Sequence, residues 1–194
     1  MNSDPATDQA ALDALRTGVP GALDGIVARW QRPLLAFAWR YVHNAADAED
    51  LVAETFVRLH QQSARLTPDT RLAAWLFTIL AHQCHNLHRW RRRHPTENLG
   101  DDGGPAEPTL AADTLAPNEA AERAEAINLV RAAVDALPHD LKTAILLHHY
   151  EHLPLREIGA IVGCSERGVE TRLYRARQRL RSVLADRLHA PTAS

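Results

Sequence analysis

The sequence predicts an all-α protein with two small helical domains joined by a flexible acidic linker. Apolar residues recur at helical spacing along most of the 194-residue chain, and no stretch shows the alternating pattern of a half-buried strand. Prolines, glycines and acids interrupt the helical pattern in residues 95–117, which contain too few apolar side chains to form a core. These observations place the first domain at residues 1–94 and the second at residues 118–194.

The first domain begins with two stretches of helical periodicity. A short helix precedes Pro20, with Leu12 and Leu15 on its apolar side. A longer stretch begins at Ala22, and Pro33 should kink or break it because proline lacks the backbone N–H that a helix interior needs.

Two further helices of this domain flank a loop at residues 66–71. The helix before the loop opens with Asp47, Glu49 and Asp50, whose carboxylates complement the positive end of a helix dipole. The helix after the loop covers residues 72–92 and ends in arginines. Its inward positions are Leu72, Trp75, Leu76, Ile79, Leu80 and Leu87.

The second domain contains four helical stretches. The first covers residues 118–136, with Ile127, Val130 and Val134 facing inward. The next follows Pro138, whose fixed backbone angle suits a first helical turn. The last two belong to the segment described next.

Residues 155–184 have the layout of a helix-turn-helix. A short helix with an apolar face ends at Gly163, which suits the left-handed conformation of a helix C-terminus, and Ser165 suits the N-cap of a longer helix. Arginines occupy most of the faces of the longer helix, namely Arg167, Arg172, Arg175, Arg177, Arg179 and Arg181. An arginine-rich helix after such a turn is typical of a recognition helix that binds DNA.

The formal net charge of −2 conceals strongly segregated charges. Residues 89–93, RWRRR, are positive apart from Trp90. Residues 97–125 contain eight acids and a single basic residue, Arg123. Such segregation is typical of a chain with basic nucleic-acid-binding surfaces and an acidic connector.

Composition and motifs exclude several classes of protein. Cys84 and Cys164 are the only cysteines, and both lie in apolar helical patterns, where a reduced thiol is the usual state. No signal-peptide pattern or membrane-spanning apolar stretch is present, so we expect a cytoplasmic protein. No Gly-rich phosphate loop, nucleophile motif or convergent carboxylate pair indicates an enzyme, a cofactor or a small-molecule substrate.

Three sequence blocks follow one another in a characteristic order. They are DAEDLVAETFVRL at residues 47–59, RLAAWLFTILAHQCHNLHRWRRR at residues 71–93, and the helix-turn-helix preceded by ALPHDLKTAILLHHYEHL. In these blocks and in the acidic linker, the chain resembles the extracytoplasmic-function (ECF) sigma factors, the two-domain specificity subunits of bacterial RNA polymerase. The resemblance implies three partners: core polymerase, through its β′ clamp and β subunits, promoter DNA, and an anti-sigma factor.

The resemblance implies that the first block docks on the clamp coiled coil of the polymerase β′ subunit. It nominates as core-binding residues Asp47, Glu49, Asp50, Leu51, Glu54 and Phe56. A structural role stays open for Leu51 and Phe56, which a core would bury, and for the acids, which also suit the start of a helix.

The second block would read the −10 promoter element and hold it open. Single-stranded DNA is held by positive grooves and by aromatic or arginine stacking surfaces. The nominated residues are Arg71, His82, His85, Arg89, Trp90, Arg92 and Arg93. Trp75 is expected in the core instead.

The third block would contact the −35 element through the recognition helix. The nominated residues are His148, Ser165, Arg167, Glu170, Thr171, Arg172, Tyr174, Arg175 and Arg177. Arginines at these positions can bridge phosphates or make bidentate contacts to guanine.

Three of these residues depart from the pattern of the family. His82 stands where many members carry Asn, and His148 stands where an Arg often touches DNA. Glu170 occupies a position that is often basic or neutral. A carboxylate there repels phosphate but can accept a hydrogen bond from a cytosine amine, so we expect an individual −35 preference.

Two alternatives stay open at this stage. One is a stand-alone helix-turn-helix regulator, which would have no use for residues 47–93. The more remote one is a metal-binding sensor built on His82, Cys84, His85 and His88. These four side chains spread widely around one helix, which disfavours a closed tetrahedral site.

Overall fold

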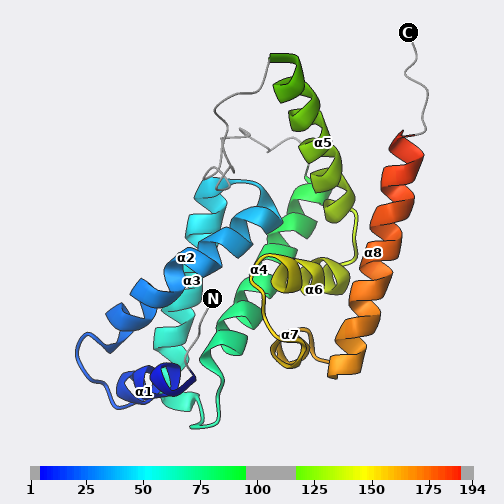
Figure 1. Ribbon diagram of the computed structural model, residues 1–194. Coiled ribbons are helices and arrows are strands. Elements are labelled where there is room, and N and C mark those ends of the chain that lie inside the picture. The colour runs from blue at the N-terminus through cyan, green and yellow to red at the C-terminus, as the bar shows by residue number, and fades with distance from the viewer. Residues whose placement is uncertain (1–4, 95–116, 189–194) are drawn as a thin grey trace.

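The computed structural model describes residues 5–94 and 117–188, and every regular element within these ranges is a helix (Figure 1). The all-α prediction is therefore confirmed. The predicted flexible linker, residues 95–117, lies outside the described residues apart from Pro117. None of the helices in the described ranges is both long and apolar enough to cross a bilayer.

The N-terminal domain contains the first helices of the chain. They are α1 (Pro5–Arg16), α2 (Ala22–Val42), α3 (Ala45–Gln62), the 3₁₀ turn η1 (Ser63–Arg65) and α4 (Leu72–Arg93). The side chain of Asn44 caps α3, because its Oδ1 accepts a hydrogen bond from the Asp47 backbone N–H at 2.9 Å. The predicted loop at residues 66–71 separates η1 from α4.

An aromatic cluster fills the centre of this domain. The ring of Phe77 on α4 lies edge-on to Trp30 and Phe37 of α2, with centroid distances of 6.1 and 5.5 Å. All three side chains are essentially inaccessible to solvent. Leu12 of α1 is also fully buried, so the short first helix is part of the core, as its apolar side predicts.

Of the kink or break predicted at Pro33, the break does not occur, since α2 is one helix from Ala22 to Val42. Trp30 before the proline and Leu34 and Phe37 after it are all buried in the same core. An interior proline costs a helix about 3 kcal/mol, whereas burying a Leu or Phe side chain contributes roughly 1.5–3 kcal/mol each. Burial on both sides of Pro33 therefore outweighs the lost hydrogen bond.

The C-terminal domain contains the remaining helices. They are α5 (Pro117–Asp135), α6 (His139–His149), α7 (Leu155–Val162) and α8 (Glu166–Leu188). Gly163 ends α7 with a φ of 67°, as predicted for the turn of a helix-turn-helix. Gly159 is needed for a different reason: a Cβ there would lie 2.6 Å from the carbonyl oxygen of Cys164.

The predicted inward face of α5 is wrong in part. Ile127 and Val130 are 39% and 44% exposed, and only the C-terminal end of the helix is packed, through Ala133 and the following Leu137. The apolar spacing alone did not reveal that the packing of α5 leaves Ile127 and Val130 largely exposed.

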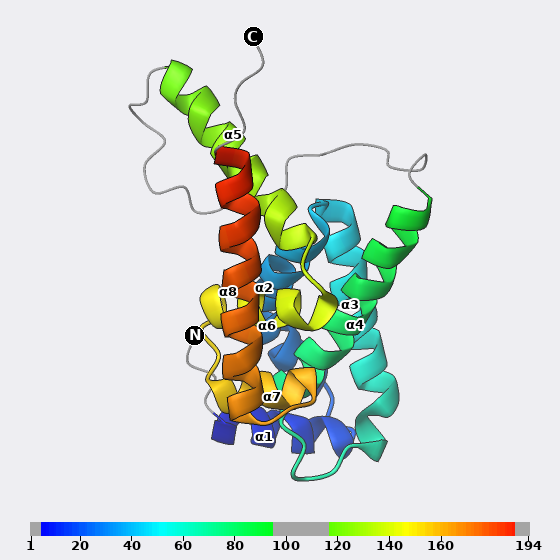
Figure 2. The ribbon, with the colours of Figure 1, turned by 90° about the vertical axis from the view of Figure 1, so that its right-hand side faces the viewer.

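The two domains are packed against each other. In Figure 1, α6 and α7 lie between α4 and α8, and Figure 2 shows α8 on the outer side of this layer. Helix α7 contacts α4, and α6 contacts α2. Leu147, Ile158 and Ile161 of the C-terminal domain belong to the same apolar core as Leu80 of α4.

We expect Phe77→Ala to lower the free energy of unfolding by about 3–5 kcal/mol, because it leaves a cavity beside two fixed aromatic rings. Urea denaturation followed by circular dichroism measures this change. Val57→Ala is the control, since Val57 is 47% exposed and its truncation should change stability by no more than about 0.5 kcal/mol. Equal losses in the two variants would contradict the position of Phe77 in the core.

Candidate nucleic-acid interface

Helix α8 presents most of the nominated −35 residues on one exposed side. Val169, Leu173 and Ala176 are buried against the domain. The opposite side exposes Arg167, Glu170, Thr171, Tyr174, Arg175 and Arg177. Ser165 caps the helix as predicted, because its Oγ accepts a hydrogen bond from the Gly168 N–H at 3.2 Å. The arrangement leaves the N-terminal half of α8 free to enter a groove of DNA.

Arg172 forms an ion pair within the chain. Its Nε donates a hydrogen bond to Oδ2 of Asp140 at 3.1 Å. The contact ties α8 to the start of α6 and leaves the Arg172 side chain only 25% exposed. The guanidinium is thus held in one orientation at the edge of the recognition surface.

His148 lies on α6 beside this surface. Burial lowers its pKa, and the nearby Arg177 lowers it further. Both effects favour the neutral imidazole, which can donate or accept a hydrogen bond.

The nominated −10 residues extend along the whole of α4. Arg71 stands at its start, while Arg89, Trp90, Arg92 and Arg93 are exposed at its end. A helix of this length covers roughly 33 Å at 1.5 Å per residue. Trp90 is 40% exposed and its ring stacks on His94 at 4.8 Å, whereas Trp75 packs against the core as expected.

The middle of α4 meets the C-terminal domain at a cluster of histidines. The ring of His85 lies against that of His139 of α6 in a tilted arrangement with a centroid distance of 4.2 Å, and the ring of His82 lies 6.0 Å from the same ring. The hydroxyl of Tyr41 shares a hydrogen bond with Nδ1 of His139 at 2.7 Å. Two nominated −10 residues therefore border α6 in this arrangement.

Lys142 is a buried charged residue between the two domains that the sequence patterns did not single out. Its side chain is 1% exposed. Its Nζ donates hydrogen bonds to the Tyr41 carbonyl oxygen at 2.8 Å and to Oδ1 of Asp135 at 2.7 Å. Burial lowers the pKa of this lysine, while the Asp135 carboxylate opposes the change. The only signal in the sequence is a lysine within the apolar run LKTAILL.

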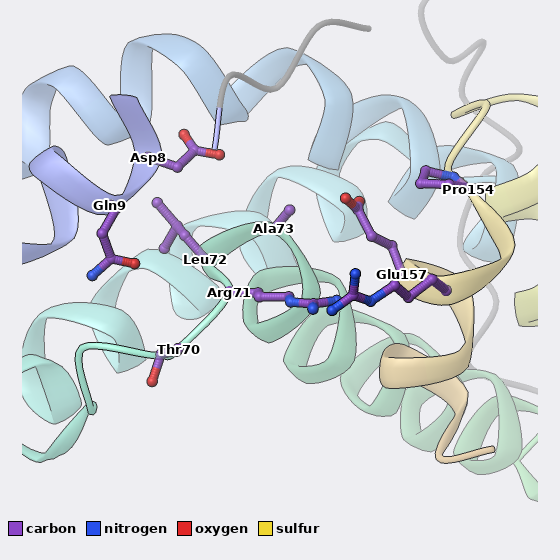
Figure 3. Close-up of a pocket in the computed structure, with 9 residues that line it drawn as sticks. Asp8, Gln9, Thr70, Arg71, Leu72, Ala73, Pro154 and Glu157 are labelled. Carbon is purple, nitrogen blue, oxygen red and sulfur yellow. The ribbon is translucent and has the colours of Figure 1, made fainter. Parts of the chain in front are cut away.

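Arg71 faces a pocket that both domains line. The pocket encloses about 400 Å³ and is bounded by α1, the start of α4 and the start of α7. Figure 3 shows Arg71 and Glu157 on facing sides of it. Arg71, which is nominated for −10 recognition, is therefore adjacent to the first helix of the helix-turn-helix.

The nominated polymerase-binding residues on α3 differ in how far they are exposed to solvent. Glu49, Asp50 and Glu54 are exposed, Leu51 is half-buried, and Phe56 is buried. Two of the acids already have partners, since Asp47 forms an ion pair with Arg91 and Glu54 accepts a hydrogen bond from Arg58 at 2.7 Å. These contacts leave Asp47 and Glu54 less available to a partner than the exposed Asp50 is.

An open groove runs beside these acids, between α2 and α3. It encloses about 340 Å³ and is lined by Val27, Gln31, Leu35, Glu49, Val52, Ala53 and Phe56. An apolar floor with a carboxylate at the rim suits a partner helix that carries both apolar and basic side chains.

A metal site is not supported by the described residues. Within the described parts of the chain, no group of three or more His, Cys, Asp or Glu side chains is placed to hold an ion. Cys84 is fully buried, and burial raises the pKa of its thiol, which opposes the thiolate that a metal would require.

Comparison with known proteins matches both halves of the chain. The model of sigma-70 region 2 matches residues 26–94, and that of sigma-70 region 4 matches residues 127–180. The ECF RNA polymerase sigma factor SigE of Mycolicibacterium smegmatis is 32% identical over 186 residues, which cover 94% of this chain and 70% of that protein. The chain belongs to the ECF sigma factors.

Further relatives agree with this assignment. The RNA polymerase sigma-H factor of Pseudomonas aeruginosa is 28% identical over 180 residues, covering 91% of this sigma factor and 93% of that protein. Two solved structures share the fold at 24% identity. CnrH in complex with the cytosolic domain of CnrY has a TM-score of 0.68, with 92% of this chain and 97% of that chain covered. RpoE of Bartonella quintana in complex with the anti-sigma factor NepR has a TM-score of 0.60, with 85% of this chain and 98% of that chain covered.

The family assignment decides between the alternatives. The sigma factor directs RNA polymerase to promoters for transcription initiation, and its family is not catalytic. A stand-alone regulator is not favoured because region 2 is present in addition to the helix-turn-helix, and a metal-binding sensor is not favoured either.

We expect the contacts around His139 to weaken as the pH falls. Burial is the main reason that its pKa is lowered to about 4, and the neighbouring His85 and His82 add to the effect, whereas Asp140 opposes it. An unfolded histidine titrates near pH 6.5, so the folded chain binds fewer protons below that value. The stability gained is complete above about pH 6.5 and is lost progressively towards pH 4.

Urea denaturation at pH 7.5 and pH 5.5 measures this effect, because most carboxyl groups stay ionised over that range. Between pH 7.5 and pH 5.5 the free energy of unfolding of the wild-type protein should decrease. The free energy of unfolding of the His139→Gln variant should decrease less. His60→Gln, at an exposed position on α3, should behave like the wild type. An identical pH response in all three proteins would contradict the role given to His139.

Proposed function

We propose that this sigma factor uses three separate surfaces: α3 for core polymerase, α4 for the −10 element and α8 for the −35 element. The observation that carries the proposal is the exposed, arginine-rich side of α8 directly after a capped helix-turn-helix. Catalysis would belong to the polymerase, and the chain would act in the cytoplasm, where the polymerase and its template are found.

On α3, the proposed docking surface combines Asp50 and Glu49 with the adjoining groove. Both acids are exposed, and Glu49 also lines the groove. The resemblance to the family supports the clamp coiled coil of β′ as the partner helix. Phe56 is proposed to shape the groove from below rather than to reach the partner, because it is 7% exposed.

On α4, the basic C-terminal turn is proposed to hold the separated strands at the −10 element. Arg89, Arg92 and Arg93 are exposed beside Trp90, which gives positive charge next to a stacking surface, the usual combination in single-strand binding. His82 and His85 would contribute polar contacts farther along the same helix.

On α8, Arg175 and Tyr174 are proposed to reach into the major groove together with Glu170. All three are exposed, and Tyr174 has 62% of its surface accessible. Asp140 would orient Arg172 through its hydrogen bond to Nε, leaving the terminal nitrogens for phosphate or guanine. The Glu170 carboxylate would repel phosphate groups and could accept a hydrogen bond from a cytosine amine. It would therefore favour some −35 sequences over others.

An anti-sigma factor is proposed as a further partner. CnrH and the Bartonella RpoE are each found with a protein partner, which in the second case is an anti-sigma factor. Such a partner would have to cover the polymerase-binding or DNA-binding surfaces described above.

Arg175→Ala should weaken binding to a −35 duplex by roughly 1–3 kcal/mol if the guanidinium contacts a base, with core-polymerase binding unchanged. Fluorescence anisotropy with a labelled duplex measures the affinity. Arg181→Ala is the matched control, since Arg181 is exposed on the same helix but farther from the end that enters the groove. Equal losses of affinity for the −35 duplex in the two variants would contradict the proposal that Arg175 contacts a base.

Asp50→Arg should reduce association with core polymerase at least tenfold, because it reverses a charge at the proposed docking surface, while binding to the −35 duplex stays the same. Titration of labelled sigma factor with purified core polymerase gives the affinity. Asp24→Arg makes the same charge change at an exposed position near the start of α2 and should bind core normally. If the Asp50→Arg variant bound core polymerase as tightly as the wild type, the proposal that α3 forms the interface would be contradicted.

A further inference from the structure

An ion pair joins the first turn of α3 to the last turn of α4. The Arg91 guanidinium contacts the Asp47 carboxylate, and the two side chains are only 26% and 23% exposed. We propose that Asp47 is a positioning residue for DNA binding: it holds the basic end of α4 through Arg91, and so keeps that turn in the form that binds a DNA strand. This inference rests on the proposed function of α4, and it removes Asp47 from the polymerase-binding residues that the family resemblance nominates.

Helix α4 leaves the core before it ends. Cys84 is its last buried residue, and Leu87 is half-buried. From residue 89 to residue 94 every side chain is exposed except that of Arg91, which is half-buried where it meets Asp47. The ion pair is therefore the contact through which α3 can hold the exposed end of α4.

The last turn of α4 needs such a contact because its charges repel one another. Arg92 and Arg93 lie three and four positions after Arg89, a spacing at which like charges face each other and destabilise a helix. The negative end of the helix dipole offsets part of this repulsion. The Asp47 carboxylate adds a negative charge from the neighbouring helix, next to Arg91 in the middle of the arginine run.

The contacts within this turn form only while it is helical. Nε of Arg93 donates a hydrogen bond to the Arg89 carbonyl oxygen at 3.4 Å, and Nδ1 of His94 lies 3.0 Å from the Trp90 carbonyl oxygen. The rings of Trp90 and His94 stack at 4.8 Å. The helical turn thus sets an aromatic ring beside several guanidinium groups. A preformed turn binds a strand more tightly, because less conformational freedom is lost on binding.

Two simpler roles for Asp47 lead to different expectations. As a first-turn acid, Asp47 could serve only the dipole of α3, whose start is already capped by Asn44. As a negative charge near a DNA-binding surface, it would only repel phosphate groups, so its neutralisation would strengthen DNA binding. A positioning role predicts the opposite, because loss of the carboxylate loosens the turn.

Binding of the full-length chain to single-stranded DNA tests the direction of this effect. The probe is a fluorescently labelled oligothymidylate, which does not pair with itself and suits a sequence-tolerant surface. Asp47→Asn should lower its affinity several-fold in an anisotropy titration. Asp24→Asn makes the same chemical change at an exposed position on α2 and should bind like the wild type. Unchanged or tighter binding by Asp47→Asn would overturn the proposal.

Exchange of the two charges separates positioning from the dipole of α3. Asp47→Arg and Arg91→Asp should each weaken binding of the oligonucleotide, and their combination should restore most of the lost affinity because the ion pair is re-formed. The combined variant still has an arginine at the positive end of α3, which a role in the helix dipole alone would not tolerate. Absence of any rescue would therefore assign Asp47 to α3 alone and overturn the positioning role.

Titration with core polymerase separates the two possible partners of Asp47. Asp47→Asn should bind core polymerase as the wild type does, in contrast to the loss expected for Asp50→Arg. A similar loss of core-polymerase affinity in both variants would return Asp47 to the docking surface and overturn the proposal.

A reference variant keeps failure of the positioning role distinct from failure of the proposed function. Arg89→Ala with Arg92→Ala removes two exposed guanidinium groups from the end of α4, and it should lose affinity for the oligonucleotide. If it binds like the wild type, the end of α4 does not hold DNA, and both proposals fail. If it loses affinity while Asp47→Asn does not, the proposed function of α4 is retained and only the role of Asp47 is overturned.

Discussion

The position of Lys142 is the constraint on which the packing of the two domains depends. A buried ammonium has to find partners for its hydrogen atoms, and this one finds them in the Asp135 carboxylate of its own domain and the Tyr41 carbonyl of the other. The end of α2 is therefore fixed against the start of α6. Helix α7 also makes an apolar contact with α4, so that one core extends through both domains.

This arrangement leaves the proposed promoter-binding helices α8 and α4 unequally exposed. The proposed reading side of α8 is exposed, whereas in the middle of α4 His85 is half-buried against His139 of α6, with His82 exposed beside it.

The sequence predicted the helices, the helix-turn-helix and the family because each depends on local patterns: apolar spacing, Gly163 and Ser165 at the turn, and three ordered blocks. It did not predict which helices lack a covering neighbour, so Ile127 was expected inside and is exposed. It also did not predict partners distant in the chain, such as Arg91 for Asp47 or Asp140 for Arg172. The spacing of apolar residues shows which face of a single helix is apolar, whereas these contacts depend on how different helices pack against one another.

Run-off transcription on a pool of genomic DNA fragments tests the central claim most directly. Purified core polymerase alone should initiate without preference, and addition of this chain should produce discrete transcripts from a small subset of fragments that share a −35 and a −10 element. Transcripts that are the same with and without the chain would contradict its role as a sigma factor.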